Sequence, residues 1–380
     1  MPETYQDRFS INFHRLPDMM DYHVMQSSHS RWERVAVNDL FVEPLDKTSA
    51  LRANYQAFAA SVTEGAVDDT VDNLGLALTY GGERYPLRDT AYKSLLDRAR
   101  IGGAALLKLK RSELADTLNL CLPLYRDTAL VLVREQKVTA AHSGGAKDYS
   151  ILPVDELLES IKFTLDERFP GNTFNSGYSD HTITDAEWSL PNHKDELLGT
   201  YRKTLEAAGQ STLASKLMPG IRFSTSDTGT SAVKVSALIL GLPYPMHIGG
   251  AVSTEHRGQA TIQEFQQSLS QLFAKFTDSV ARLEKLTAVY LDYPVNVMTA
   301  ICKKLLMPKT ASLEAIGMYE MACGDNAATA HDVFVAMNEI MFICKNANVP
   351  ESKMLLLEEN MARALTLNWV SFDTAKAVTW

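Results

Sequence analysis

Residues 223–240 read FSTSDTGTSAVKVSALIL, a run of small polar residues around Gly229 followed by a β-branched apolar run. Glycine supplies the positive φ that tight turns require, and β-branched residues favour strands. We therefore predict a strand over residues 220–226, a turn over 227–230 and a second strand over 231–240. Within this turn we expect Asp227 and Thr228 to bond the local backbone.

The same stretch lacks the spacing of two catalytic loops. A phosphate loop places several glycines before a Lys-Ser or Lys-Thr pair, but this stretch has only Gly229, and Lys234 lies in the predicted strand. A nucleophile elbow needs glycines on both sides of its serine, and no serine here has them. We interpret the stretch as a hairpin turn and predict no catalytic residue in it. The alternative, a polar turn that touches a ligand, would use Ser224, Ser226, Asp227 and Gly229.

Strand patterns are confined to the part of the chain before residue 260, and the remainder has helical periodicity. We predict an α+β fold, with a central antiparallel or mixed sheet, flanking helices and a predominantly helical C-terminal third. Residues 1–260 would form an α+β body with an irregular N-terminal arm, and residues 261–380 a helical layer packed on it as one structural unit. The more local expectations are strands at 74–80 and 181–190, a hairpin at 128–141 turning at 135–137, helices at 49–63, 104–121 and 261–290, and loops at 65–73 and 170–181.

Composition excludes several classes of protein. The chain has 380 residues and a formal net charge of −9, which excludes a wholly basic nucleic-acid coat but not a local basic groove. The four cysteines form no CxxC pair and have no histidine at zinc spacing, so we expect reduced thiols. The N-terminus lacks a signal-peptide pattern, and no apolar run approaches the ~18–20 residues that span a bilayer. We expect a cytoplasmic protein without membrane contact.

Basic residues gather in two places. The segment around KLKR holds Arg98, Arg100, Lys108, Lys110 and Arg111, with Tyr92 and Tyr125 nearby in sequence. Such a cluster can contact nucleic-acid phosphates, and neighbouring aromatic rings can stack on bases. The alternative is an ordinary solvated helix face. The second cluster is Lys303, Lys304 and Lys309.

Glu255, His256 and Arg257 are adjacent polar residues before a predicted helix. Neighbours in a strand point to opposite faces, so they form no local catalytic triad. Arg257 and the first amides of the next helix could receive a phosphate, and His256 is included in the candidate site.

His142 and Ser143 are interpreted as a loop. His181 and His193 have no metal-ligand spacing, so we predict neither a metal nor a cofactor.

Four segments, in this order, resemble the DUF 932 family of phage- and plasmid-like proteins. They are residues 130–161 (LVLVREQKVTAAHSGGAKDYSILPVDELLESI), 221–240 (IRFSTSDTGTSAVKVSALIL), 249–258 (GGAVSTEHRG) and 325–342 (DNAATAHDVFVAMNEIMF). This chain has Gly249-Gly250 where the family has Asn-Gly, and it inverts the order of His256 and Arg257. The resemblance implies a protein of a mobile element, of a family supposed to assist DNA replication or recombination.

Three functions follow as hypotheses. The first is a non-catalytic accessory protein that binds single- or double-stranded DNA. The second is a self-assembling scaffold or a factor that binds host or phage proteins, since the C-terminal helices carry long apolar stripes. The third is an enzyme acting on nucleotides or nucleic acid through His256, Arg257 and Asp227.

Overall fold

The hairpin of residues 218–240 lies within the largest sheet of an α+β fold. A computed structural model describes residues 3–125, 128–145, 147–324 and 326–380. The hairpin consists of β10 (Met218–Thr225) and β11 (Val233–Leu240), which pair antiparallel with Ile221 opposite Ala237. Gly229, in the turn between them, has φ +73°. The predicted strand–turn–strand order and the positive φ of Gly229 are therefore confirmed.

The hairpin is part of a six-stranded sheet in which every neighbouring pair is antiparallel. One face of this sheet is apolar, with Trp188, Phe223 and Val235 buried on it. The other face is polar, because Glu187 and Ser236 both lie opposite Arg222. The strand order is β1 (Ser10–Phe13), β8 (Thr173–Asp180), β9 (Thr184–Ser189), β10, β11 and β12 (Met246–Thr254).

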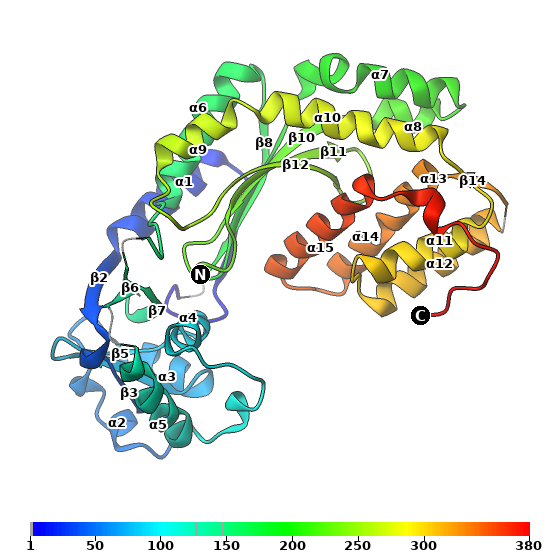
Figure 1. Cartoon of the computed structure of the whole chain (residues 1–380). Coiled ribbons are helices and arrows are strands. Elements are labelled where there is room, and N and C mark those ends of the chain that lie inside the picture. The colour runs from blue at the N-terminus through cyan, green and yellow to red at the C-terminus, as the bar shows by residue number, and fades with distance from the viewer. Residues whose placement is uncertain (1–2, 126–127, 146, 325) are drawn as a thin grey trace.

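Helices cover the apolar face, and Figure 1 shows them along the outer side of the curved sheet. They bury leucine and phenylalanine side chains against the strands, for example Leu198, Phe265 and Phe276. These helices are α1 (Leu16–Ser28), α6 (Val154–Arg168), α7 (Lys194–Ala207), α8 (Ser211–Lys216), α9 (Ile262–Leu269) and α10 (Leu272–Lys285).

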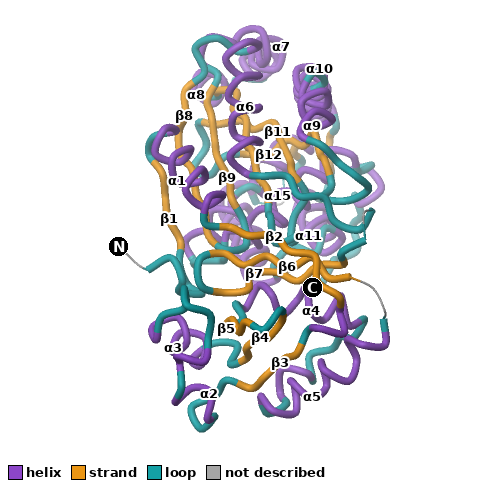
Figure 2. The backbone as a smooth tube through the Cα atoms, turned by 90° about the vertical axis from the view of Figure 1, so that its left-hand side faces the viewer, coloured by secondary structure: helices purple, strands orange, loops and turns teal. Residues whose placement is uncertain are grey.

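Residues 30–144 form an N-terminal lobe with a hydrophobic core of its own. Figure 2 shows the β2–β6–β7 sheet crossing between the large sheet and the β3–β4–β5 sheet. The lobe consists of β2 (Ser30–Ala36), β3 (Phe41–Pro44), α2 (Ala50–Ala53), α3 (Glu64–Asp72), β4 (Leu76–Tyr80), β5 (Glu83–Pro86), α4 (Asp89–Ala99), α5 (Arg111–Cys121), β6 (Thr128–Arg134) and β7 (Lys137–Ser143).

The C-terminal third is predominantly helical. Its elements are β13 (Tyr290–Leu291), α11 (Pro294–Lys304), α12 (Lys309–Cys323), β14 (Ala328–Thr329), α13 (Ala330–Met337), α14 (Glu339–Asn346) and α15 (Glu351–Arg363). α15 lies against the polar side of the sheet, where Glu358 pairs with Arg222 and Glu359 with Lys234. The larger core includes residues before and after 260, such as Phe223 and Phe334. The division of the chain into a body of residues 1–260 and a helical layer of residues 261–380 stays a prediction.

The N-terminal fifty residues differ from the expected irregular arm. They contain β1, α1, β2 and β3, and β1 forms the edge of the large sheet. α1 was missed because the residues that it buries are Met19, His23 and Gln26, so it has no continuous apolar stripe.

Other local differences have similarly local causes. The expected helix at 49–63 starts at its predicted cap, Ser49, but α2 ends at Ala53 and Asn54 leaves the helical conformation. Residues 65–72 of the expected loop belong to α3, which buries only small side chains and Val67. Residues 173–180 form a strand, in which Gly177 allows the close approach of Met19. The stripe at 261–290 is two helices, and only residues 111–121 of the segment 104–121 are α-helical.

Candidate functional site

The turn between β10 and β11, here called the polar turn (residues 226–230), lies at the boundary between the sheet and the N-terminal lobe. Ser226 closes it, since its Oγ accepts a hydrogen bond from Thr230 N at 3.3 Å and lies 2.7 Å from Thr230 Oγ1. We expected Asp227 to make these local bonds. Its carboxylate instead pairs with Arg134, at the end of β6. The polar turn therefore connects two parts of the chain.

The pair of Arg134 and Asp227 is held from both sides. Arg134 Nε donates to Ser30 Oγ at 2.9 Å, and Tyr149 Oη donates to the Asp227 carbonyl oxygen at 2.7 Å. Burial alone would raise the pKa of the Asp227 carboxyl, but the charge and hydrogen bond of Arg134 outweigh burial and lower it. Asp227 is thus a carboxylate at neutral pH, with its charge neutralised by Arg134.

Aromatic and imidazole rings stack beside this pair. The Tyr149 ring lies 3.9 Å from the His142 ring at 5°, and 5.4 Å from the His256 ring at 10°. Trp32 extends the group, with its ring centroid 5.6 Å from that of Tyr149. Burial lowers the pKa of His142 to about 4 and also lowers the pKa of His256, so both rings are neutral at pH 7. His256 Nδ1 lies 3.2 Å from the Ser150 carbonyl oxygen, which orients its ring.

A cavity of about 220 Å³, here called the inner cavity, lies on one side of the stack. Its wall includes the rings of Tyr22, Trp32 and Tyr149, together with His23 and His181. Among its charged lining residues, one is basic and four are acidic: Arg134, Asp155, Glu156, Asp180 and Asp227. Burial lowers the pKa of His23 to about 4 and that of His181 well below its usual range, so neither adds positive charge at pH 7.

A wider pocket of about 550 Å³, here called the outer pocket, lies on the other side and shares Tyr149 with the inner cavity. Its rim carries Lys147 and Arg257, and Asp97 of α4 also lines it. The Arg257 side chain is 78% exposed, and its Nε lies 3.6 Å from Glu255 Oε2. His256, its neighbour in sequence, is buried in the ring stack. The two residues thus face different surroundings, although β12 ends at Thr254 and neither lies in a strand.

The basic segment divides between structural and exposed residues. Arg98 is buried and donates to the Tyr125 carbonyl oxygen at 3.1 Å, and Arg111 donates to the Asn73 carbonyl oxygen at 3.1 Å. The guanidinium of Arg100 lies 4.4 Å from the centre of the Tyr125 ring. Arg100, Lys108 and Lys110 are exposed. The second cluster lies on the C-terminal helices, where Lys303 Nζ donates to the Thr379 carbonyl oxygen at 2.7 Å.

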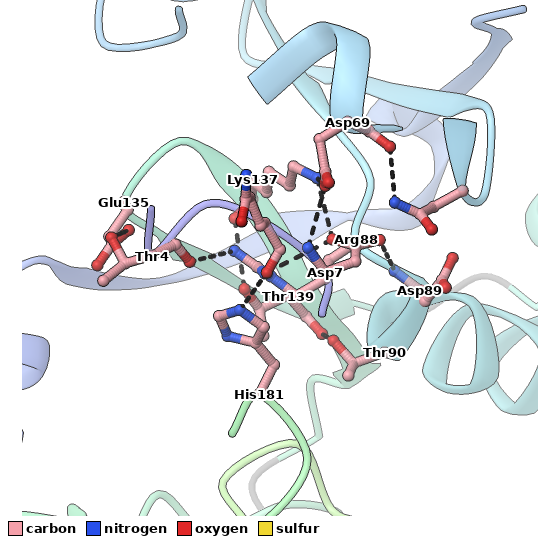
Figure 3. A network of polar contacts seen from close by, with 12 residues as sticks. Thr4, Asp7, Asp69, Arg88, Asp89, Thr90, Glu135, Lys137, Thr139 and His181 are labelled. Carbon is pink, nitrogen blue, oxygen red and sulfur yellow. Dashed lines mark hydrogen bonds and ion pairs between the residues drawn. The ribbon is translucent and has the colours of Figure 1, made fainter. Parts of the chain in front are cut away.

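Two buried charge networks were not foreseen from the sequence. In the first, the N-terminal arm (residues 3–9) passes between the lobe and the large sheet, and Figure 3 shows its contacts. Asp7 contacts Lys137 and Arg88, and Lys137 also pairs with Asp69. His181 Nε2 lies 2.8 Å from the Gln6 carbonyl oxygen. The sequence predicts Lys137 in the turn of a hairpin, but it is the buried first residue of β7. Its partners are 130 and 68 positions away.

The second network lies on the polar face of the sheet. Arg222 pairs with Glu187 at 3.1 Å and with Glu358 of α15. Asp185 is on the same face, and Oδ2 of its buried carboxyl has no hydrogen-bond partner among the described residues. Burial raises the pKa of Asp185 to about 7. Ser224 is also buried on this face, opposite Lys234, and therefore does not belong to the turn surface.

Within residues 3–125, 128–145, 147–324 and 326–380, no group of three or more histidine, cysteine, aspartate or glutamate side chains is arranged to hold a metal ion. In the same residues, no helix has the length and hydropathy needed to cross a membrane. Comparison of the chain with protein-family models, curated proteins and solved structures found no significant match.

Proposed function

We propose that this protein binds single-stranded nucleic acid, without catalysis, along the basic segment of the N-terminal lobe and across the outer pocket. The resemblance to the DUF 932 family fits such binding in support of replication or recombination of a mobile element.

The observation that carries the proposal is a local excess of positive charge on an acidic protein. Residues 93–111 contain six basic residues and one acidic residue, in a chain of net charge −9. Four of the six are exposed: Lys93, Arg100, Lys108 and Lys110. Figure 1 shows the loop after α4 projecting from the N-terminal lobe. An exposed cluster of this kind neutralises phosphates and releases their counterions.

The basic segment adjoins the outer pocket, because Asp97 of α4 belongs to both. Lys147 and Arg257 line this pocket next to the ring stack of His142, Tyr149 and His256. Three carboxylates line it as well, those of Asp97, Asp148 and Glu255, so the phosphate contacts are assigned to the exposed basic residues of the segment and the base contacts to the rings. A single strand offers phosphates to cations and unpaired bases to rings, whereas a duplex keeps its bases stacked. The combination therefore favours a single strand over a duplex.

Fluorescence anisotropy of labelled oligonucleotides at low salt tests this proposal. We expect the Lys108→Glu/Lys110→Glu variant to lose at least about tenfold in affinity, since it removes two phosphate contacts and adds two repulsions. The matched control is Lys304→Glu/Lys309→Glu, which changes net charge equally on the C-terminal helices. Equal losses in both variants, or no binding by the unmodified protein at low salt, would contradict the proposal.

A further inference from the structure

The inner cavity has the opposite electrostatic character from the basic segment. Among the described residues that line it, Arg134 alone is basic, and it is already paired with Asp227, while three further carboxylates line the wall. Negative potential of this kind repels phosphate. Whatever binds there is therefore neutral or positively charged.

The chemistry of the wall suits a flat ring. Tyr22, Trp32 and Tyr149 supply aromatic surface, and the neutral ring of His23 lies among them. His23 is only 5% exposed, and its Nε2 has no hydrogen-bond partner among the described residues. A buried nitrogen without a partner is unfavourable, and a ligand that supplies a hydrogen bond removes that penalty.

The size of the cavity limits the ligand to one small group. An engineered protein cavity of about 150 Å³ binds a benzene ring. The inner cavity, at about 220 Å³, is somewhat larger. It therefore suits one heterocycle with its exocyclic groups and excludes a base pair.

We propose that the inner cavity takes one unstacked nucleobase, stacked on an aromatic ring of the wall and hydrogen-bonded to His23 Nε2. The base would come either from a bound strand, in which case this inference rests on the proposed function, or from a free nucleoside. In the first case the phosphates stay outside the cavity, and the acidic wall admits only the base.

The test compares an oligonucleotide of about twelve nucleotides, within the usual range of single-strand sites, with an abasic sugar-phosphate chain of equal length. A second arm titrates the four common nucleosides and follows tryptophan fluorescence, since Trp32 lines the cavity. We expect the full-length protein to bind the intact strand about tenfold more tightly than the abasic chain. His23→Phe should abolish this preference and leave affinity for the abasic chain unchanged.

The matched control is His247→Phe, because His247 is also 5% exposed and its Nδ1 also lacks a partner among the described residues, but it lies on β12. It should keep the preference for the intact strand. If His23→Phe does not fold, Trp32→Leu takes its place and should reduce the preference for the intact strand.

The outcomes separate the two proposals. Equal binding of intact and abasic strands, with no fluorescence response to any nucleoside, overturns the nucleobase site and leaves the proposed function standing. Failure to bind either strand, with a nucleoside response that His23→Phe removes, overturns the proposed function and supports a free nucleoside as ligand. Equal behaviour of His23→Phe and His247→Phe overturns the assignment of His23.

Discussion

Lys137 Nζ lies 2.9 Å from Asp7 Oδ1, and neither side chain is more than 3% exposed. The pair joins the N-terminal arm to β7 of the N-terminal lobe. A few residues further on, β1 continues the same chain into the large sheet. The arm therefore connects lobe and sheet through buried charges, and its contribution can be measured.

Replacing Asp7 with alanine should lower the free energy of unfolding by about 3–5 kcal/mol, because it leaves buried Lys137 and Arg88 short of a negative partner. Urea unfolding followed by circular dichroism measures this change. The control is Asp166→Ala, which breaks the exposed pair with Lys162 and should change stability by less than about 1 kcal/mol. Similar losses in the two variants would show that the Asp7 network does not stabilise the fold as a buried pair should.

Replacing Gly229 with alanine should destabilise the protein by about 1–2 kcal/mol and disturb the ring stack. At φ +73° a side chain is strained, and a Cβ there would lie 3.0 Å from His142 Cε1. Gly81→Ala is the control, since Gly81 has φ +57° but no atom within 4 Å of its Cβ position. It should carry the backbone strain without moving His142. If both variants bind nucleic acid with the same affinity, the position of the His142 ring does not affect binding.

The central hairpin was predictable because its signal is local. Gly229 and the β-branched run of β11 determine a turn and a strand without reference to the remainder of the chain. The contacts of the same turn were not predictable, since Asp227 and Arg134 are 93 positions apart. Lys137 is the clearest example. Its polarity favours a turn, but Asp7 and Asp69 make its burial in β7 possible, and nothing in the sequence pairs them with it.

In the candidate site, too, local features were predictable from the sequence and contacts between distant segments were not. The sequence predicted a cluster of basic residues near position 100, and the structure leaves Arg100, Lys108 and Lys110 exposed. It did not predict the inner cavity, whose wall combines residues from α1, β2 and the segment between β7 and α6. A cavity between distant segments has no local pattern, so Tyr22, His23 and Trp32 could not be identified as neighbours.

Asp185 should make stability depend on pH in an unusual direction. Its pKa is raised to about 7 by burial, so between about pH 4 and pH 7 the folded protein holds a proton that the unfolded chain has lost. The contribution of Asp185 to the free energy of unfolding is therefore full below about pH 4 and decreases as pH rises to about 7.

Urea unfolding of the wild type and of Asp185→Asn across this range measures the effect. We expect the stability of the wild type relative to the variant to fall with rising pH and to level off above pH 7. The buried histidines titrate in both proteins and cancel in the difference. A pH-independent difference would mean that Arg222, which faces Asp185, keeps it ionised throughout.

The salt dependence of binding should report the two exposed lysines of the basic segment. Each phosphate contact to a single strand contributes about 0.7 to the slope of log affinity against log salt concentration. Lys108→Gln/Lys110→Gln should therefore reduce the magnitude of that slope by about 1.4, without the repulsion that glutamate would add. Anisotropy titrations at several salt concentrations measure the slope directly.

Arg98→Gln offers the contrast, because Arg98 is buried and bonded to the Tyr125 carbonyl oxygen. It should destabilise the fold while leaving the slope of the folded protein unchanged. A slope that falls equally in both variants would show that the strand does not follow the exposed lysines.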